Sequence, residues 1–541
     1  MSNHRYIWAA RGDVNSFFGL MLDNVAGLIM AVTMLAGVFQ FPVDFAIRYM
    51  VPGTAIGVLV GDLMYFVLAF VLAKRTGRND VTAMPLGLDT PSTIGMVFFV
   101  LGPAFSAAKA AGMTEHDAAL HTWHVGIWAI IITGLVKLVL SFWSSWAQRF
   151  FPRAGLLGSL AAIALALIAF MQLPKLLVNP VAGFTSLIVV LITLIGRNKL
   201  PFRIPGAFAA VAIGCVLWHL MRGLDAGLGI QLLSGTPETV ASAWFPREWL
   251  TVFEFGWLGA WKETLAFLPY IIPFAITTVI GGIDCAESAA SAGDEYSTGS
   301  IIGVEALATI FAGFCGGVIQ TTPYIGHPAY KAMGGRAAYT LATALFVGGA
   351  GIVGYFGLLF AWIPEAAVLP ILIFIGIEIT AQSFQATPRR HYAALAFACM
   401  PAFAKLVMIT VGQILPFVDS AQLPGSLNST ILFLSVLAAG FIITSLLWSS
   451  ALADIIDRRF NQAAIYLGIA AVLTVFGVIH SPLPGDKMFL PWELTESMNV
   501  RVVWELAACY LLMAGFLVLT GRFTRDLNPP INTDEEFEAL S

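Results

Sequence analysis

The sequence has little charge. Asp, Glu, Lys and Arg make up 11% of its 541 residues, whereas hydrophobic residues make up 58%. Soluble domains carry about 25% charged residues, so the composition excludes a soluble globule and predicts a polytopic membrane protein. The net charge is −4 and the basic residues form no single patch. We therefore expect no nucleic-acid partner.

Cysteine and catalytic motifs are also scarce. The five cysteines lie in apolar surroundings without CxxC spacing, which is typical of small core residues. The chain has no HExxH, no GxSxG and no cysteine–histidine cluster with metal-ligand spacing. It also has no GxxxxGK[ST] phosphate loop. These absences argue against an enzyme, against a metal or other cofactor, and against ATP as the driving force.

Long hydrophobic runs, by contrast, fill the chain. With about 20 apolar residues for each span, sixteen candidate spans can be placed, two of them short or interrupted. Their ranges are 14–38, 48–73, 84–105, 120–147, 154–173, 178–196, 205–222, 264–286, 299–318, 320–333, 336–362, 364–382, 391–416, 429–449, 460–480 and 501–520.

The basic residues predict the orientation of these spans. If the N-terminus is cytoplasmic, eighteen Lys and Arg residues fall in inside loops and seven in outside loops. Positive charge is enriched on the cytoplasmic side of membrane proteins. We therefore expect cytoplasmic N- and C-termini in an integral protein of a bacterial-type inner membrane, with the lipid bilayer as its surroundings.

Two spans are broken by proline, glycine and polar residues. Residues 81–93 read VTAMPLGLDTPST and residues 320–328 read QTTPYIGHP. The two breaks lie in the third and tenth spans, which are an odd number of spans apart, so they enter the membrane from opposite sides. This pattern predicts an inverted repeat. Paired broken spans indicate a transporter's binding site, where half-helix N-termini face the substrate.

Two acidic residues occur near the end of the eighth span. Asp284 and Glu287 are three residues apart, so they share one face of a helix. Two carboxylates close together in a low dielectric do not both ionise readily. We expect Glu287 to exchange protons and Asp284 to contact substrate. The alternative is that both are solvated at the cytoplasmic mouth.

Other polar residues in the spans have two interpretations each. Asp89 is either a substrate contact or the N-cap of a half-helix, and Asp23 and Asn24 are either structural or substrate contacts. His327 is either a functional group, donating to a substrate carbonyl or titrating near neutral pH, or a buried packing residue. The remaining charged residues in or near spans are interpreted as interhelical pairs or interfacial side chains. They are Glu305, Asp62, Lys137, Glu378 and Lys405.

The passage from Gly303 to Tyr324 resembles a known family. Its GVEALA run, Gly316-Gly317 and the following TTPY are similar to the nucleobase/ascorbate (xanthine/uracil permease) transporters and their adenine/guanine permease-like relatives. That family carries an acid in its eighth span, which Asp284 or Glu287 matches. Where the family has an acid in the tenth span, this chain has Gly326, followed by His327.

The resemblance implies an all-α fold of two inverted repeats of seven spans, with spans 3 and 10 as a short strand plus half-helix. It implies a core domain (14–147 and 264–362) and a gate domain (154–222 and 364–449), and a homodimer. Residues 460–520 would be two additional C-terminal spans, and 521–541 a cytoplasmic tail. The candidate substrate contacts are then Asp89, Thr90, Thr93, Asp284, Glu287, Gln320, Thr321, Thr322, Tyr324, Gly326 and His327. The candidate proton-coupling residues are Glu287, Asp284 and His327.

The sequence therefore predicts an elevator-type secondary transporter. Its expected substrate is a small planar nucleobase-like heterocycle such as a purine or pyrimidine, carried with a proton rather than sodium. The alternative is a small inorganic or organic anion on the same fold, which two helix N-termini would suit. The carboxylate pair argues against an anion unless it is protonated.

Overall fold

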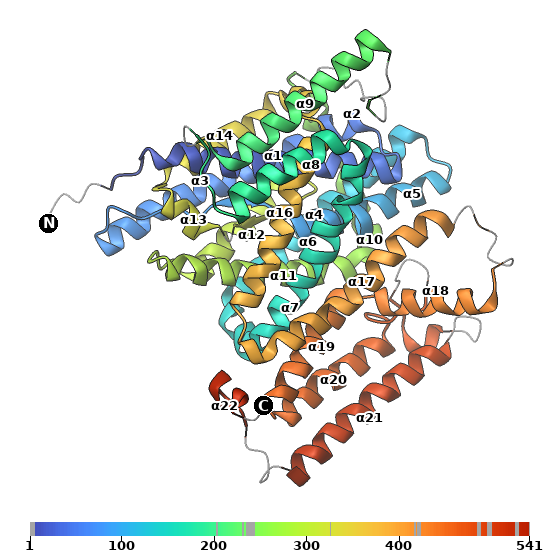
Figure 1. Ribbon diagram of the computed structural model, residues 1–541. Coiled ribbons are helices and arrows are strands. Elements are labelled where there is room, and N and C mark those ends of the chain that lie inside the picture. The colour runs from blue at the N-terminus through green and yellow to red at the C-terminus, as the bar shows by residue number, and fades with distance from the viewer. Residues whose placement is uncertain are drawn as a thin grey trace. The chain divides into compact units, whose positions relative to one another are not determined.

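The computed structural model describes residues 6–201, 204–229, 232–233, 244–324, 326–415, 418, 423–483, 488–494, 500–524 and 530–539. These residues are almost entirely helical and contain two short strands (Figure 1). The predicted all-α polytopic fold is confirmed.

The elements follow the predicted order of spans. The first part of the chain forms α1 (Gly12–Phe39), α2 (Val43–Phe45), α3 (Val51–Thr76), β1 (Leu86–Leu88), α4 (Thr90–Met96), α5 (Gly102–Ala110) and α6 (Glu115–Phe150). The middle part forms α7 (Arg153–Ile163), α8 (Pro180–Val190), α9 (Gly206–Leu228), α10 (Trp261–Thr264), α11 (Leu268–Ser291), α12 (Thr298–Phe314), β2 (Thr321–Pro323), α13 (His327–Ala332), α14 (Ala338–Ile352) and α15 (Phe356–Trp362). The last part forms α16 (Glu365–Gln385), α17 (Tyr392–Ile414), α18 (Gly425–Ala438), α19 (Phe441–Ile456), α20 (Phe460–Val475), α21 (Val500–Thr524) and α22 (Asp534–Glu538).

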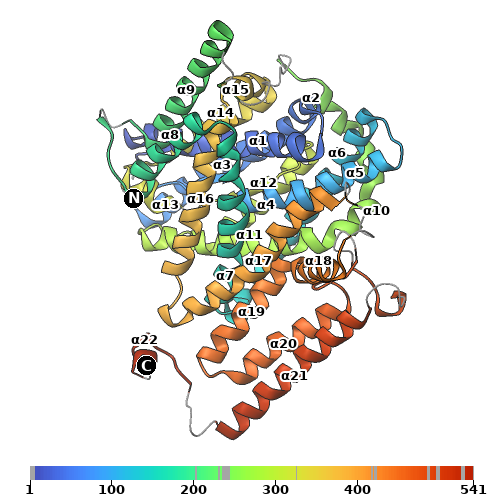
Figure 2. The ribbon, with the colours of Figure 1, turned by 45° about the vertical axis from the view of Figure 1, so that its right-hand side comes forward.

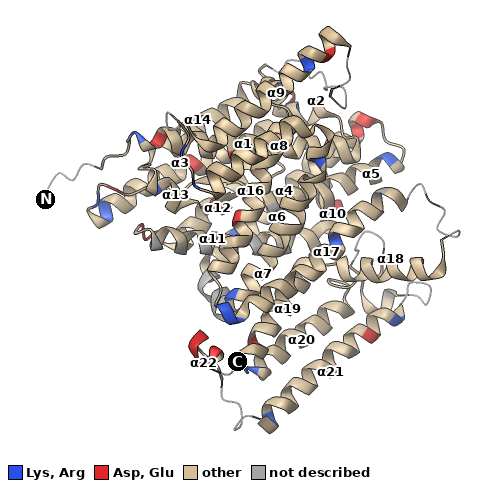
Figure 3. Ribbon diagram, viewed as in Figure 1, with Lys and Arg blue, Asp and Glu red and all other residues tan. Residues whose placement is uncertain are grey.

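Most of these helices are apolar along much of their length. Within the described residues, nine helices are long and apolar enough to cross a membrane, or up to twelve if each of three bent pairs is one span. Three shorter apolar helices are Pro180–Ile195, Thr298–Phe314 and Phe460–Val475. Figure 3 shows most charged positions at helix ends and in loops, with long uncharged stretches between them. The chain is an integral membrane protein.

Contacts divide the chain into two compact units. The first unit contains Met1–Ser144 and Gln172–Phe374, and the second contains Ser145–Met171 and Ile375–Ser541. Both strands belong to the first unit. The assignment of spans to a core and a gate domain stays a prediction.

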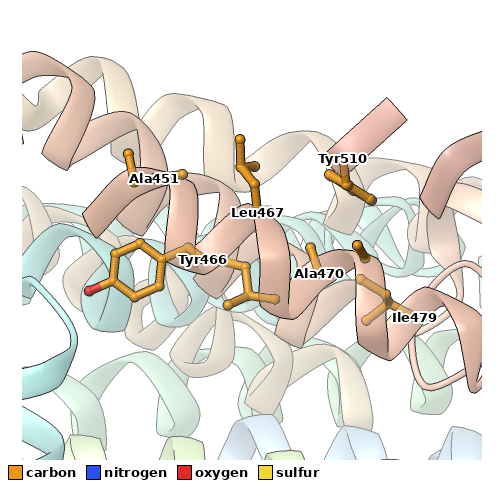
Figure 4. Packing of buried hydrophobic residues seen from close by; sticks show 9 residues of the cluster. Ala451, Tyr466, Leu467, Ala470, Ile479 and Tyr510 are labelled. Atoms are coloured by element: carbon orange, nitrogen blue, oxygen red, sulfur yellow. The ribbon is translucent and has the colours of Figure 1, made fainter. Parts of the chain in front are cut away.

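The second unit has an apolar core between α19, α20 and α21. Ala451, Tyr466, Leu467, Ala470, Ile479 and Tyr510 are among its buried residues (Figure 4). Alanines at helical spacing let these helices approach closely, which favours dense packing in the absence of a strong hydrophobic drive between spans. The two predicted C-terminal spans therefore pack against the helix before them.

The residues around α22 contact loops of the second unit. Arg390 Nε lies 2.8 Å from Asp457 Oδ1 and Arg390 Nη1 lies 2.7 Å from Asp534 Oδ1. The backbone N–H of Ile531 donates to the carbonyl of Asp457 at 3.1 Å. Thr533 and Glu536 form a capping box that starts α22. The described part of the tail is thus tied to the loops before α17 and before α20.

In the first unit, α3 lies directly against its neighbours through glycines. A Cβ on Gly53 would lie 2.2 Å from Cys315 O, one on Gly57 2.7 Å from Ala312 Cβ, and one on Gly61 2.5 Å from Leu86 Cδ1. Glycine at four-residue spacing permits such close approach. Helix α3 therefore packs closely against α12 and β1, and it also lies beside α14 (Figures 1 and 2).

The two predicted breaks form a small sheet. β1 and β2 are antiparallel, with Leu86 opposite Pro323, Gly87 opposite Thr322 and Leu88 opposite Thr321. Pro85 and Pro323 keep Met84 and Thr322 out of the helical region, which favours extended chain inside a span. After β1, Asp89 is the N-cap of α4: its carboxylate accepts from Ser92 N–H at 2.9 Å. The prediction of a strand and half-helix in spans 3 and 10 is confirmed.

Candidate functional site

The outer edge of β1 is bonded to side chains from two helices. Asn24 on α1 donates to Leu86 O at 3.3 Å and accepts from Leu88 N–H at 3.1 Å. Asp62 on α3 accepts from Leu86 N–H at 3.2 Å. A strand inside a membrane needs all its backbone groups satisfied. These two side chains therefore take the place of a third strand.

The outer edge of β2 has a charged neighbourhood. Lys137 on α6 donates to Thr321 O at 3.0 Å and pairs with Glu305 Oε1 on α12 at 2.6 Å. Both side chains are fully buried. The Thr309 hydroxyl lies 3.4 Å from the N–H of Thr321, which donates to it. The expected interhelical role of Lys137 and Glu305 is confirmed.

Gln320, just before β2, joins both broken spans. Its Nε2 donates to Asp89 Oδ2 at 3.3 Å, and its Oε1 accepts from the Thr278 hydroxyl on α11 at 3.4 Å. The N-cap interpretation of Asp89 is the one that the structure shows. The end of β1, the start of β2 and α11 thereby meet around one buried amide.

A small cavity lies beside this amide, between α4, α6 and α11. Its volume is about 10 Å³, roughly the space of one water molecule. The lining residues are Ser92, Gly95, Met96, Val100, Ile130, Thr133, Tyr270, Ile271, Phe274 and Gln320. They offer hydroxyl and amide groups but carry no charge.

Aromatic rings fill the space in front of α4. Phe99 stacks on Tyr270 with centroids 5.2 Å apart, and on Phe274 with centroids 6.3 Å apart. A Cβ on Gly95 would lie 2.3 Å from the Phe274 ring, so only glycine leaves room for this ring. A solute larger than water would have to displace Phe274 or Tyr270.

His327 lies in a different cluster of the same unit. Its Nε2 is 3.1 Å from Thr82 O and 3.3 Å from Asp294 Oδ2. Asp294 Oδ1 also pairs with Lys331 at 2.6 Å and Arg78 at 3.1 Å. Burial by itself raises the pKa of Asp294, but hydrogen bonds from His327, Lys331 and Thr82 N–H outweigh it and hold the pKa below its usual value.

The predicted contact residues therefore fall into three groups. Asp89, Thr90, Thr93, Gln320, Thr321 and Thr322 lie at the paired strands and the start of α4. Tyr324, Gly326 and His327 lie beyond β2, where Tyr324 N–H donates to Pro85 O at 2.8 Å and Gly326 is the N-cap of α13. Asp284 and Glu287 lie in α11, and their side chains are outside the described residues.

Three important residues were not identified as site residues from the sequence. Thr278 and Thr133 are single threonines in apolar helices, and nothing in the pattern marks them. Asp294 lies in the polar run between α11 and α12, where an acid after a glycine in a turn is ordinary. No cluster of three or more His, Cys, Asp or Glu side chains that could hold a metal occurs in the part of the chain that the structure describes.

Comparisons with known proteins give only distant likeness. No protein-family model and no curated protein matches this chain. Among solved structures, the transmembrane domain of a cyanobacterium bicarbonate transporter, BicA, matches at 14% identity and a TM-score of 0.44, over 76% of this chain and 97% of that one. The structure of SLC26A9 matches at 14% identity and a TM-score of 0.44, over 74% of this chain and 65% of that one. Murine Solute Carrier 26 family member A9, an anion transporter in the inward-facing state, matches at 13% identity and a TM-score of 0.41, over 77% of this chain and 69% of that one. Membership of the nucleobase/ascorbate family is not confirmed.

Proposed function

We propose that this chain is a secondary active transporter of a small inorganic or organic anion. The observation that supports this is the cavity at Gln320, whose described lining is uncharged and mostly apolar and includes the polar side chains of Ser92, Thr133 and Gln320. It lies beside the first turns of α4, and helix N-termini carry partial positive charge.

Two carboxylates near the cavity are described, and both accept hydrogen bonds from the protein. Asp89 accepts from Ser92 N–H and from Gln320, and Glu305 is paired with Lys137. Lys137 therefore neutralises the charge of Glu305, whereas the two neutral donors stabilise the Asp89 carboxylate without cancelling its charge.

A planar nucleobase-like heterocycle is the second candidate. Tyr270 and Phe274 line the cavity and stack with Phe99, and such rings suit a flat aromatic solute. The Gln320 amide can both donate and accept hydrogen bonds. The resemblance around Gly303 to Tyr324 implies the same class of substrate.

The transport cycle that we propose follows from the family resemblance. The core spans (14–147 and 264–362) would carry the solute past the gate spans in an elevator movement, driven by a proton gradient. A homodimer in a bacterial-type inner membrane, with both termini cytoplasmic, completes the proposal. A cysteine introduced at exposed Arg75, at the end of α3, should react with a membrane-impermeant thiol reagent only from the cytoplasmic side.

The test is uptake by the purified full-length chain in proteoliposomes. One panel contains bicarbonate, chloride, sulfate, formate and acetate, and the other contains adenine, guanine, xanthine and uracil. Saturable uptake of an anion, competed by other anions and not by bases, supports the first candidate. Uptake competed only by bases supports the second, and no saturable uptake from either panel overturns both.

Thr133 and Thr122 make a matched pair of variants for the cavity. Both are buried threonines on α6 whose hydroxyls donate to the carbonyl four residues earlier, but only Thr133 lines the cavity. Thr133→Val should weaken apparent substrate affinity by about 2- to 10-fold, because it removes one hydrogen-bonding hydroxyl. Thr122→Val should leave the affinity unchanged. Equal affinities in the two variants would show that the solute does not bind in this cavity.

A further inference from the structure

Asp62 is a buried carboxyl group that has no cationic partner in the described part of the chain. It lies near the middle of the 26-residue helix α3, and its side chain is fully buried. Its Oδ1 accepts from Leu86 N–H at 3.2 Å, but its Oδ2 has no hydrogen-bond partner. An unpaired ionised carboxylate at this depth is very unfavourable, whereas a neutral carboxyl group is far less so.

The other ionisable groups near Asp62 add no positive charge. Those close enough to interact with its charge are Tyr65 on α3, Tyr330 on α13 and Tyr339 on α14. Tyr330 also interacts with Asp23 on α1, whose Oδ2 lies 3.5 Å from the position of a Cβ on Gly87. Tyr65 also interacts with Glu305, which is paired with Lys137, and Lys137 makes a further contact with Thr321 O.

We propose that Asp62 is the proton-carrying group of the transport cycle. The inference rests on the proposed function, and it assigns proton coupling to the face of β1 away from β2 instead of to the acids of the eighth span. In the arrangement described here Asp62 is protonated on Oδ2. When the site is open to one side of the membrane, Asp62 takes up a proton from water and forms the O–H bond. When the site is open to the other side, this bond breaks and the proton returns to water.

The link to the solute runs through β1. Leu86, whose N–H bonds to Asp62, lies four residues before the start of α4, and α4 lines the cavity. A Cβ on Gly61 would lie 2.5 Å from the Leu86 side chain, so α3 and β1 are in close contact. Deprotonation of Asp62 creates an unpaired charge next to β1, which favours a movement that admits water. The protonated form favours the closed packing.

The experiment measures proton-driven accumulation in proteoliposomes with the membrane potential held at zero. With the outside one pH unit more acidic, a transporter that carries one proton with each solute accumulates that solute about tenfold. We expect this accumulation in the wild type and none in Asp62→Asn, which keeps the acceptor for Leu86 N–H. Solute exchange without a gradient should persist in Asp62→Asn. Asp44→Asn, at an exposed acid paired with Arg48, is the matched control and should accumulate like the wild type.

An infrared spectrum gives a second readout that needs no transport. The purified wild type should show the carbonyl stretching band of a protonated carboxyl group that shifts in D₂O, and Asp62→Asn should lack it. Asp62→Glu keeps a titrating group, so it should restore part of the accumulation and shift the band. A merely structural acceptor would leave both the accumulation and the band unchanged in Asp62→Asn.

The outcomes separate this inference from the proposed function. Two outcomes would show that Asp62 is not the proton carrier and would leave the proposed transport function intact. In one, the wild type transports a solute without responding to the pH gradient. In the other, Asp62→Asn accumulates the solute like the wild type. If the wild type transports neither panel but the protonated-carboxyl band depends on Asp62, the proposed substrates are wrong while the proton site stands. Absence of that band in the wild type overturns the inference.

Discussion

The two strands of the first unit have the same shape but different electrostatic surroundings. Each is three residues long, and each has an outer edge bonded to side chains of neighbouring helices. Behind β2, Glu305 is paired with Lys137, whereas behind β1, Asp62 has no cation among the described residues. The comparison teaches that the surroundings of β2 are fixed in charge, while those of β1 can change charge by gaining or losing a proton.

The largest effect that we expect comes from breaking the ion pair behind β2. Lys137→Met leaves Glu305 as a buried unpaired charge, which should lower the free energy of unfolding by about 3–5 kcal/mol. Denaturant unfolding in mixed micelles measures this change. Adding Glu305→Gln should recover most of the loss, whereas Asp62→Asn alone, which removes no ion pair, should cost about 1 kcal/mol or less. Similar losses in Lys137→Met and Asp62→Asn would refute the electrostatic difference between the strands.

The side chains that bond the strand edges come next. Asn24→Ala leaves Leu86 O and Leu88 N–H of β1 without partners, and each such group costs about 1–3 kcal/mol. Thr309→Val on the β2 side leaves one group, the N–H of Thr321, without a partner, because Lys137 still donates to Thr321 O. It should therefore cost about 1–3 kcal/mol, roughly half of the loss in Asn24→Ala. The two variants are compared by the midpoint of thermal unfolding in detergent. A larger shift in Thr309→Val would mean that β2, not β1, depends on its hydroxyl and amide partners.

A glycine pair tests how tightly α11 approaches Glu305. A Cβ on Gly282 would lie 2.9 Å from Glu305 Oε2, whereas a Cβ on Gly281 meets no atom within 4 Å. Gly282→Ala should therefore destabilise the fold by about 1–3 kcal/mol. Gly281→Ala should be neutral or stabilising, since alanine has the higher helix propensity. Equal unfolding midpoints for the two variants would show that α11 does not pack closely on the ion pair.

The smallest effect concerns Asp294, which links the chain before β1 to the helix after β2. Its folded-state pKa is lowered, so its contribution to stability is present above the ordinary aspartate pKa of about 3.9 and is lost as pH falls through the lower folded value. Unfolding midpoints measured from pH 6 to pH 3 should therefore fall more steeply in the wild type than in Asp294→Asn. Parallel pH profiles would mean that Asp294 is not favourably ionised in the folded state.

The sequence predicted the fold well because its signals are local. Apolar windows located the spans, and the prolines near Asp89 and Thr322 marked the two breaks. The partners of the strands could not be predicted, because they come from distant parts of the chain: Lys137 and Glu305 are 168 residues apart. The sequence showed that both charges lie inside spans, which suggested a pair, but it could not show which residues meet. The aromatic filling at Phe274 depends on Gly95, and no periodic pattern reports that contact.

The candidate site was predicted in part for the same reason. Gln320 and Asp89 stand next to the breaks, so the motif itself pointed to them. Thr278 and Thr133 lie in uninterrupted apolar helices, where a single hydroxyl is common. Asp62 was expected to pair with another helix, because buried acids usually have a cation nearby. Its missing partner becomes visible only when every neighbouring helix is in place.

The contact between Arg390 and Asp534 has a consequence for biogenesis. The two residues are 144 positions apart, and the helices α17 to α21 lie between them in the chain. During synthesis Arg390 emerges 67 residues before Asp457 and 144 residues before Asp534. Asp457 can therefore pair with it first, while α20 and α21 are still to be made, and the contact with Asp534 can form only after the last span has left the ribosome.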